Sequence, residues 1–452
     1  MSYEIMNPAT EEVLRTIDLL GLDETDRAIE ASECAGERWK KVAPADRARL
    51  LRRFASVVDS HVEELAQLEV ANAGHTIANA RWEAGNVRDV LNYYSGAPER
   101  HSGKQIPVAG GVDITFYEPL GVVGIIAPWN FPMPIAGWGF APALAAGNTV
   151  LLKPATLTPL TALRLGELAL EAGLPENVFQ VLPGAGSSVG YRFVTHPLVR
   201  KVCFTGSNAA GRTIMAGCAD QVKRVTLELG GKSANIIFAD ADVARAAAMA
   251  PYAVFDNAGQ DCCARSRILV EESAYDTFME FFETAVKAVK VMDPTMDASE
   301  MGPLITAAQR ESVLSYVDEE HVAFRGSAPT GKGYWMAPTV LETSDTSSRA
   351  FTEEIFGPVV SVVRFRDEEH AVALANDSDF GLSGSIWTRD SSRALRVARA
   401  VQTGALSVNS NSSVRYSTPF GGFKMSGIGR ELGPDALLGF SEEKNVFIST
   451  EE

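Results

Sequence analysis

Short apolar runs that alternate with helical patterns constrain the fold of this chain more than any other feature. Four such runs cover residues 121–127, 149–152, 178–182 and 201–204, and each is followed by a stretch of helical pattern such as 160–172. Buried strands that alternate with helices predict a parallel, doubly wound sheet with helices on both faces. Ligands bind such sheets at the carboxyl ends of the strands.

A second α/β block begins near residue 230. Strands are expected at 233–238 and 268–270 and helices at 243–255 and 275–289, and the alternation continues to about residue 408. Residues 24–95 instead have apolar side chains at three- and four-residue spacing, which predicts helices. At 452 residues the chain exceeds the roughly 250–300 residues at which single cores stop growing, so more than one domain is expected.

The charge balance argues against nucleic acid as a partner. The chain has 41 Lys and Arg against 57 Asp and Glu, a formal net charge of −16, which repels phosphate backbones and anionic membranes. Five cysteines, two of them adjacent, do not form a disulfide framework, so a reducing compartment is expected. No charged segment followed by an apolar stretch opens the chain, and we therefore expect a cytoplasmic location.

One charge-free stretch, residues 119–152, is long enough to span a bilayer. Prolines interrupt it, and each would leave backbone groups unpaired in lipid. A buried strand, a turn and a buried helix fit better, so we interpret the stretch as core and expect no membrane association. The prolines are Pro128, Pro132, Pro134 and Pro142.

Two segments bring a carboxylate and a thiol that suit acyl chemistry. Val-Thr-Leu-Glu-Leu-Gly-Gly-Lys (225–232) places Glu228 at the end of a β-rich run, where two glycines allow a close turn. Phe-Asp-Asn-Ala-Gly-Gln-Asp-Cys-Cys-Ala-Arg-Ser-Arg (255–267) supplies Cys262. A sulfur nucleophile beside a carboxylate base can form a thioester and hydrolyse it. The cysteines outside this segment, Cys34, Cys203 and Cys218, stand alone in the sequence. We expect each of them to be a small apolar side chain in the core rather than a nucleophile.

Other polar groups follow predicted strands. Asn130, in Pro-Trp-Asn-Phe-Pro (128–132), suits an oxyanion hole, with an ordinary turn as an equal alternative. No Gly-x-Gly-x-x-Gly follows a predicted strand; instead, Phe-Thr-Gly-Ser (204–207) precedes a helix. Its Gly206 and Ser207 either receive a phosphate on free N–H groups or simply cap the helix. Lys153, in Leu-Leu-Lys-Pro-Ala-Thr (151–156), either adds a cation at the sheet edge or is a surface lysine.

Taken together, these motifs resemble those of the aldehyde dehydrogenase superfamily. The resemblance runs from Asn-Pro-Ala-Thr (7–10) through the segments above to Pro-Phe-Gly-Gly-Phe-Lys-Met-Ser-Gly (419–427). It implies an α/β fold with two doubly wound Rossmann-like domains and a small β oligomerisation extension. The dinucleotide-binding domain would comprise residues 1–103 and 119–229, the catalytic domain 230–425, and the oligomerisation segments 104–118 and 426–452.

The resemblance also implies a mechanism. The Cys262 thiolate would attack a small-molecule aldehyde, and Asn130 with the backbone N–H of Cys262 would hold the resulting oxyanion. Hydride would pass to a nicotinamide cofactor, and water activated by Glu228 would release a carboxylic acid. Asp261, next to the nucleophile, would oppose thiolate formation as a like charge. No metal is expected.

Cofactor residues are carried over by position. Lys153 would bind the adenosine ribose, and Gly206 and Ser207 the pyrophosphate. Thr156 stands where many members have Glu; without that carboxylate a 2′-phosphate is not repelled, so NADP should be accepted and dual use with NAD is expected. The full set is Trp129, Lys153, Thr156, Gly206, Ser207, Leu229, Glu354 and Phe356.

The aldehyde channel is assigned by the same matching. Two carboxylates there would attract a cationic aminoaldehyde, whereas Arg415 could clamp the carboxylate of a semialdehyde. The simplest alternative is that these charges pair with one another at a solvated mouth and leave a broad apolar preference. The residues are Trp138, Asp256, Asp261, Val414 and Arg415.

Two other functions stay open. Acylating members of the superfamily pass the thioester to coenzyme A, although Glu228 favours hydrolysis. A catalytically silent structural protein on this scaffold is the second. For assembly, the apolar terminal run 445–450 needs a sheet edge to join. The resemblance implies a neighbouring subunit, and hence a homodimer or homotetramer.

Overall fold

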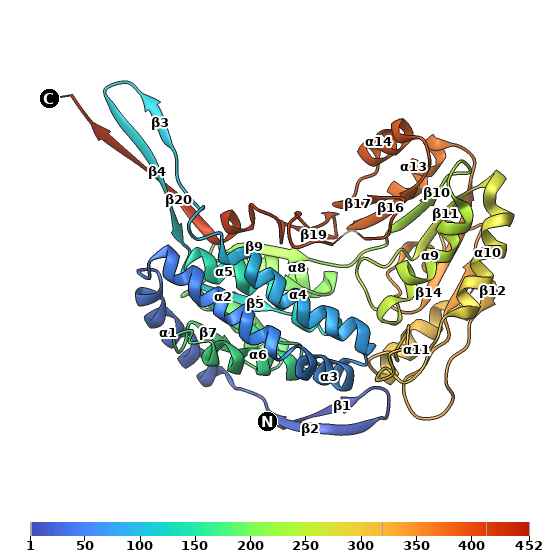
Figure 1. Ribbon diagram of the computed structural model, residues 1–452, viewed down its shortest axis with the longest axis horizontal. Helices are drawn as coiled ribbons and strands as arrows, with labels where there is room; N and C mark the ends of the chain where they lie inside the picture. Colours follow the sequence, from blue (N-terminus) through green and yellow to red (C-terminus); the bar gives the residue numbers. More distant parts are fainter. Residues whose placement is uncertain (1, 319, 413, 452) are drawn as a thin grey trace.

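The computed structural model describes residues 2–318, 320–412 and 414–451, which form two α/β units and a projecting β arm (Figure 1). The sheet of the first unit has the order β19-β9-β8-β5-β6-β7. Its five strands β5 to β9 are parallel, as predicted, and only β19 is antiparallel. The strands are β5 (Val122–Ile126), β6 (Thr149–Lys153), β7 (Phe179–Val181), β8 (Val199–Thr205), β9 (Arg224–Glu228) and β19 (Gly427–Ile428).

Alternate residues of these buried strands face opposite layers of helices. Val123 and Ile125 pack into the core beneath α2, α4, α5 and α6, whereas Val122 and Leu151 pack against α1, α7 and α8 on the other face, as the two-residue period of a strand requires. The helices are α1 (Leu22–Trp39), α2 (Pro44–Ser60), α3 (Val62–Ala73), α4 (Ile77–Ser95), α5 (Pro132–Ala146), α6 (Leu160–Glu171), α7 (Tyr191–Thr195) and α8 (Asn208–Ala219).

The charge-free stretch 119–152 forms part of this core. It folds into β5, α5 and most of β6, and every residue of α5 is buried. Among the described residues, no helix is long and apolar enough to cross a membrane.

The second unit is also doubly wound. Its seven-stranded sheet has the order β12-β13-β14-β11-β10-β16-β17, parallel except for β12. Two clusters of buried apolar side chains lie on its two faces. The strands are β10 (Ala234–Ile237), β11 (Arg267–Glu271), β12 (Val322–Arg325), β13 (Thr339–Glu342), β14 (Val359–Phe365), β16 (Ser383–Trp387) and β17 (Ala405–Val408). The helices are α9 (Val243–Phe255), α10 (Tyr275–Ala288), α11 (Ala307–Val317), α12 (Arg349–Thr352), α13 (Glu368–Asn376) and α14 (Ser391–Ala400).

Shorter elements complete both units. An N-terminal hairpin pairs β1 (Ser2–Asn7) with β2 (Glu12–Asp18), and β15 (Phe380–Gly381) pairs with β18 (Phe423–Lys424). The single-turn helices are η1 (Gly186–Gly190), η2 (Asp256–Gly259), η3 (Glu272–Ala274) and η4 (Ala436–Phe440).

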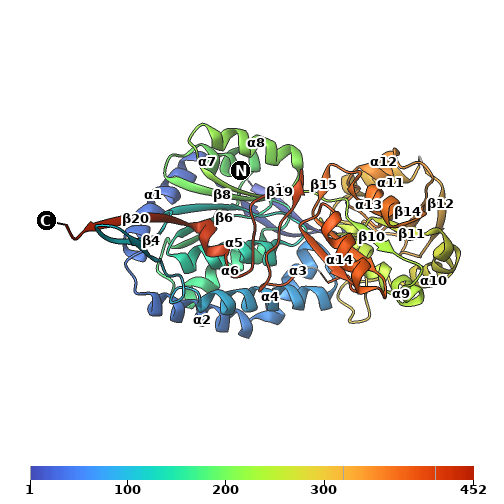
Figure 2. The ribbon, with the colours of Figure 1, turned by 90° about the horizontal axis from the view of Figure 1, so that it is seen from above.

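The arm projects away from both units (Figures 1 and 2). It is a three-stranded antiparallel sheet of β3 (Gln105–Val108), β4 (Gly111–Pro119) and β20 (Ser441–Ser449), in the order β20-β4-β3. The terminal strand therefore has a partner in its own chain, β4, along its whole length. Residues 426–440 do not extend into the arm. β19 pairs with β9, and Leu437 and Phe440 are buried in the core of the first unit, so the arm is smaller than the segments 104–118 and 426–452.

Candidate active site

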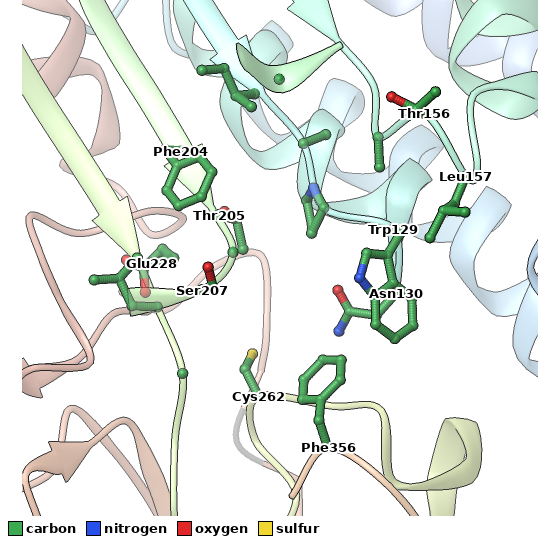
Figure 3. A pocket seen from close by; sticks show the side chains of 18 of the residues that line it. Trp129, Asn130, Thr156, Leu157, Phe204, Thr205, Ser207, Glu228, Cys262 and Phe356 are labelled. Atoms are coloured by element: carbon green, nitrogen blue, oxygen red, sulfur yellow. The ribbon is translucent and has the colours of Figure 1, made fainter. Parts of the chain in front are cut away.

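A cavity of about 550 Å³ lies at the carboxyl ends of β5, β6, β8 and β9, where a doubly wound sheet is expected to bind its ligand. Its volume is within the about 300–1,000 Å³ range of small-molecule sites. The first unit contributes the strand ends, and the second contributes Cys262, Gln309, Glu354 and Phe356. In Figure 3 the sulfur of Cys262 and the amide of Asn130 point into this space from opposite units.

The loop that carries Cys262 is held in an unusual backbone conformation. After α9 ends, Asn257, Ala258 and Gly259 all have positive φ, at 50°, 54° and 70°. Left-handed non-glycine residues cost about 1–3 kcal/mol each, so surrounding contacts must hold them. A Cβ on Gly259 would lie 2.1 Å from the carbonyl oxygen of Gly357, so this position requires glycine. The chain thereby turns back and presents Cys262 to the first unit.

Two hydrogen bonds tie that loop to Asn130. The Asn257 side-chain amide donates to the backbone carbonyl of Asn130 at 2.8 Å, and the Asn130 amide donates to the carbonyl of Gln260 at 2.9 Å. An amide NH2 has two hydrogens, and in the described part of the chain only the bond to Gln260 is found. The second hydrogen can be donated to an oxygen bound in the cavity.

The surroundings of Cys262 disfavour its thiolate form. A hydrogen bond with Cys263, followed by burial, raises the pKa of Cys262 well above that of an ordinary thiol. Asp261 raises the pKa further as a like charge, as predicted. Formation of the thiolate therefore needs a base or a cation close to the sulfur.

Glu228 is the end residue of β9 and only 3% of it is exposed. Within the described ranges neither carboxyl oxygen has a hydrogen-bond partner. Burial, and then the nearby Glu431, raise the pKa of Glu228 well above its usual range. Gly427 pairs with Glu228 across the β9–β19 ladder, and Gly206 N–H donates to the Glu228 carbonyl at 3.0 Å. The backbone is thus fixed while the side chain is free to accept a proton.

The eight predicted cofactor residues all line this one cavity. Lys153 is 4% exposed, burial lowers its pKa to about 8, and no hydrogen bond or ion pair to its ammonium group is found among the described residues. Glu354 accepts a hydrogen bond from Gly231 N–H at 2.9 Å, and burial raises its pKa to about 7. Trp129 and Phe356 meet edge to face at 5.2 Å. The cavity wall is therefore mostly apolar, with a few fixed polar groups.

Ser207 combines the two alternatives considered for it. Its hydroxyl caps α8 by accepting from Ala210 N–H at 3.4 Å, and it also lines the cavity with Gly206. Thr156 lies on the opposite wall, where its hydroxyl donates to the Gly184 carbonyl at 3.3 Å.

The five predicted substrate residues lie outside this cavity. Trp138 on α5 donates to Asn86 at 3.0 Å. Asp256 accepts from Asn79, and Asp261 accepts from Cys263 N–H at 2.8 Å. Val414 packs on the first core, and Arg415 is exposed. In the part of the chain described, Arg415 forms no ion pair with either aspartate, so the pairing proposed as the simplest alternative is not found.

Sequence reasoning missed four polar residues. Asn257 and Gln260 hold the loop, Gln309 lines the cavity and donates to the Phe356 carbonyl at 2.8 Å, and Glu431 raises the pKa of Glu228. Glu431 itself is buried, which raises its pKa to about 7. Gln309 and Glu431 lie far from Cys262 in sequence, and no local motif marks them.

Comparisons with known proteins identify the family of this chain. The aldehyde dehydrogenase family profile matches residues 1–446. An aldehyde dehydrogenase of Emericella nidulans is 37% identical over 98% of this chain and 91% of its own length. Retinal dehydrogenase 2 of Gallus gallus is 40% identical over 99% of this chain and 88% of its own length. The crystal structure of betaine aldehyde dehydrogenase from Staphylococcus aureus with NAD+ has a TM-score of 0.97 at 36% identity, covering 100% of this chain and 92% of that one.

The chain belongs to the aldehyde dehydrogenase family. It is an enzyme that oxidises aldehydes.

Proposed function

We propose that this enzyme converts an aldehyde to the carboxylic acid through a thioester on Cys262, which water activated by Glu228 hydrolyses, with NAD or NADP as oxidant. The observation that carries the proposal is one cavity lined by Cys262, Glu228 and Asn130 together with the cofactor residues. In this arrangement the first unit binds the cofactor and the second unit places the nucleophile, Cys262, beside it.

Each residue has a defined part in the chemistry. The Cys262 sulfur bonds to the aldehyde carbon, and the carbonyl oxygen becomes an oxyanion that accepts the free Asn130 hydrogen. The nicotinamide cofactor, when bound, supplies the hydride acceptor that converts the adduct to a thioester. Glu228 then removes a proton from water, whose oxygen attacks the thioester carbon and releases the acid and the thiol. Burial raises the pKa of Glu228. The carboxylate form that this step needs therefore forms at a higher pH than in an ordinary glutamate.

The cavity wall also fits a dinucleotide. Lys153, at the end of β6, suits ribose hydroxyls, and the start of α8 at Gly206 and Ser207 suits a pyrophosphate. Glu354 and Phe356 approach from the second unit, where the nicotinamide end is needed beside Cys262. The NAD+ complex of the S. aureus relative supports the same use here.

A location in the reducing cytoplasm is part of the proposal. All five cysteines, Cys34, Cys203, Cys218, Cys262 and Cys263, are free thiols in the structure.

Glu228→Ala separates acylation from hydrolysis. We expect a stoichiometric burst of reduced cofactor followed by a nearly stalled steady state, because the thioester forms but water is not activated. Stopped-flow absorbance measures both phases. Cys262→Ala, which should bind cofactor and show no burst, is the control. Turnover of the Glu228 variant at the parental rate contradicts the general-base assignment, and rescue of turnover only by coenzyme A indicates the acylating alternative.

Thr156→Glu tests the cofactor assignment. The parent enzyme should use NADP efficiently alongside NAD. A carboxylate at position 156 would face the 2′-phosphate at a cost of about 1–4 kcal/mol. The kcat/KM for NADP should therefore fall tenfold or more, while the kcat/KM for NAD changes little. kcat/KM for both cofactors is the measurement, with Thr156→Gln as the uncharged control of similar length. A parent that ignores NADP and uses NAD well shows this interpretation of Thr156 to be wrong.

By position matching with the family, Asp256 and Asp261 border the aldehyde channel, outside the cavity described above, and two carboxylates there would favour a cationic aldehyde. Each carboxyl is half-buried, and no described arginine or lysine forms an ion pair with Asp256. Burial and Asp261 raise the pKa of Asp256 to about 6, so its charge develops as the pH rises through that value. The kcat/KM ratio of an aminoaldehyde to a neutral aldehyde of equal length should increase about tenfold from pH 5 to pH 8. Asp256→Asn should flatten the increase; a ratio near one throughout supports the broad apolar preference.

We further propose a homodimer or a dimer of dimers, assembled through the arm. β3 and β20 are its outer strands, and several large apolar side chains on it are 37–52% exposed: Ile106, Val108, Val112, Phe116, Phe447 and Ile448. Light scattering at micromolar concentration should give a dimer or tetramer mass. Phe447→Lys with Ile448→Glu should lower that mass and leave the fold intact, because both side chains already face outward. A monomer mass for the unmutated protein would contradict the proposal.

A further inference from the structure

A second group of potential ligands lies outside the cavity, in the helical layer of the first unit. Glu69 on α3, His75 in the α3–α4 connection and Glu83 on α4 are 0%, 2% and 0% exposed. One ligand atom from each lies within 4.8 Å of the other two. His75 Nδ1 is hydrogen-bonded to Glu83 Oε1 and lies 3.9 Å from Glu69 Oε1.

The carboxyl groups of this cluster lack the partners that burial demands. Among the described residues, both oxygens of Glu69 and Oε2 of Glu83 accept no hydrogen bond, and no Lys or Arg pairs with either. Isolated buried carboxylates are costly, so buried acids either pair, hold protons or bind a cation. Burial raises the pKa of Glu69 to about 8 and that of Glu83 well above its ordinary value.

The imidazole is already oriented toward the two carboxyls. Its ring packs edge to face against Phe131 at 5.5 Å and lies beside the backbone of Asn130. Burial lowers the pKa of His75, which favours the neutral ring that metals bind. The Thr161 hydroxyl lies close to Glu69 and adds a further oxygen.

We propose that Glu69, His75 and Glu83 form a binding site for a divalent transition-metal ion of the zinc class. Imidazole nitrogen and carboxylate oxygen are ligands that Zn²⁺ and Co²⁺ accept. Ligands of a tetrahedral zinc ion lie about 3.3 Å apart, between the hydrogen-bonded His75–Glu83 contact and the 3.9 Å separation of His75 from Glu69. The bound ion replaces the protons of the two carboxyls and supplies the missing partner for Glu69.

Co²⁺ and Zn²⁺ titrations test the site. Asp261, Cys262 and Cys263 are another group that could bind such ions, so the titration uses the Cys262→Ser, Cys263→Ser double variant. Equilibrium dialysis with metal analysis should find one ion per chain. Glu69→Gln in the same background should weaken binding at least tenfold. His61→Asn is the matched control, because His61 faces Glu64 at 3.8 Å in a partly exposed pair. This variant should bind the ion as the parent does.

Proton competition and thermal stability give independent readouts. Binding should be weaker at pH 6 than at pH 8, because protons occupy Glu69, Glu83 and the neighbouring Asp256 at low pH. Saturating Co²⁺ should raise the Tm of the double variant and leave that of the Glu69→Gln variant unchanged. Failure of the double variant itself to bind one ion overturns the proposal even if Glu69→Gln does not fold. Undiminished binding by Glu69→Gln also overturns it. The cluster then holds protons only.

Discussion

The reciprocal hydrogen bonds between Asn130 and the 256–263 loop are the constraint on which the site depends. Asn257 donates to the Asn130 carbonyl, and Asn130 donates to the Gln260 carbonyl. These bonds join the strand-end turn of one unit to the nucleophile loop of the other. They also offset the left-handed conformation of Asn257 and Ala258. Asn130 and Cys262, the residues proposed to hold the oxyanion and to attack the aldehyde, are therefore positioned by the same contacts.

Desolvation sets the resting charge of the site. The hydrogen bond with Cys263, and then burial, raise the pKa of Cys262. Burial raises the pKa of Glu228 and Glu354 and lowers that of Lys153, so the neutral form of each group is favoured. A neutral thiol and a neutral acid facing an apolar wall are unreactive. A bound cofactor brings a cationic ring and anionic phosphates, which favour the charged forms of Cys262 and Lys153.

The apolar pattern of the sequence was sufficient for the architecture, whereas the site residues were assigned mainly by resemblance to a family. Apolar runs predicted β5, β6, β7 and β8 because parallel strands buried on both faces cannot alternate in polarity. The cofactor residues were assigned by resemblance to the aldehyde dehydrogenase superfamily, and all eight line one cavity. The arm was predicted less well, since β20 pairs with β4 of its own chain. A pattern of apolar residues shows that a strand needs an edge but does not identify which edge.

Glu69, His75 and Glu83 show why the remaining contacts could not be predicted. Helical periodicity does place Glu69 and Glu83 on their helices, yet an acidic residue in such a pattern is normally assigned to the solvated face. Both are fully buried because α3 and α4 pack on each other and turn these positions inward. Asn130 and Phe131 lie directly against His75. The cluster therefore lies against the segment that carries Asn130, the residue proposed as the oxyanion donor.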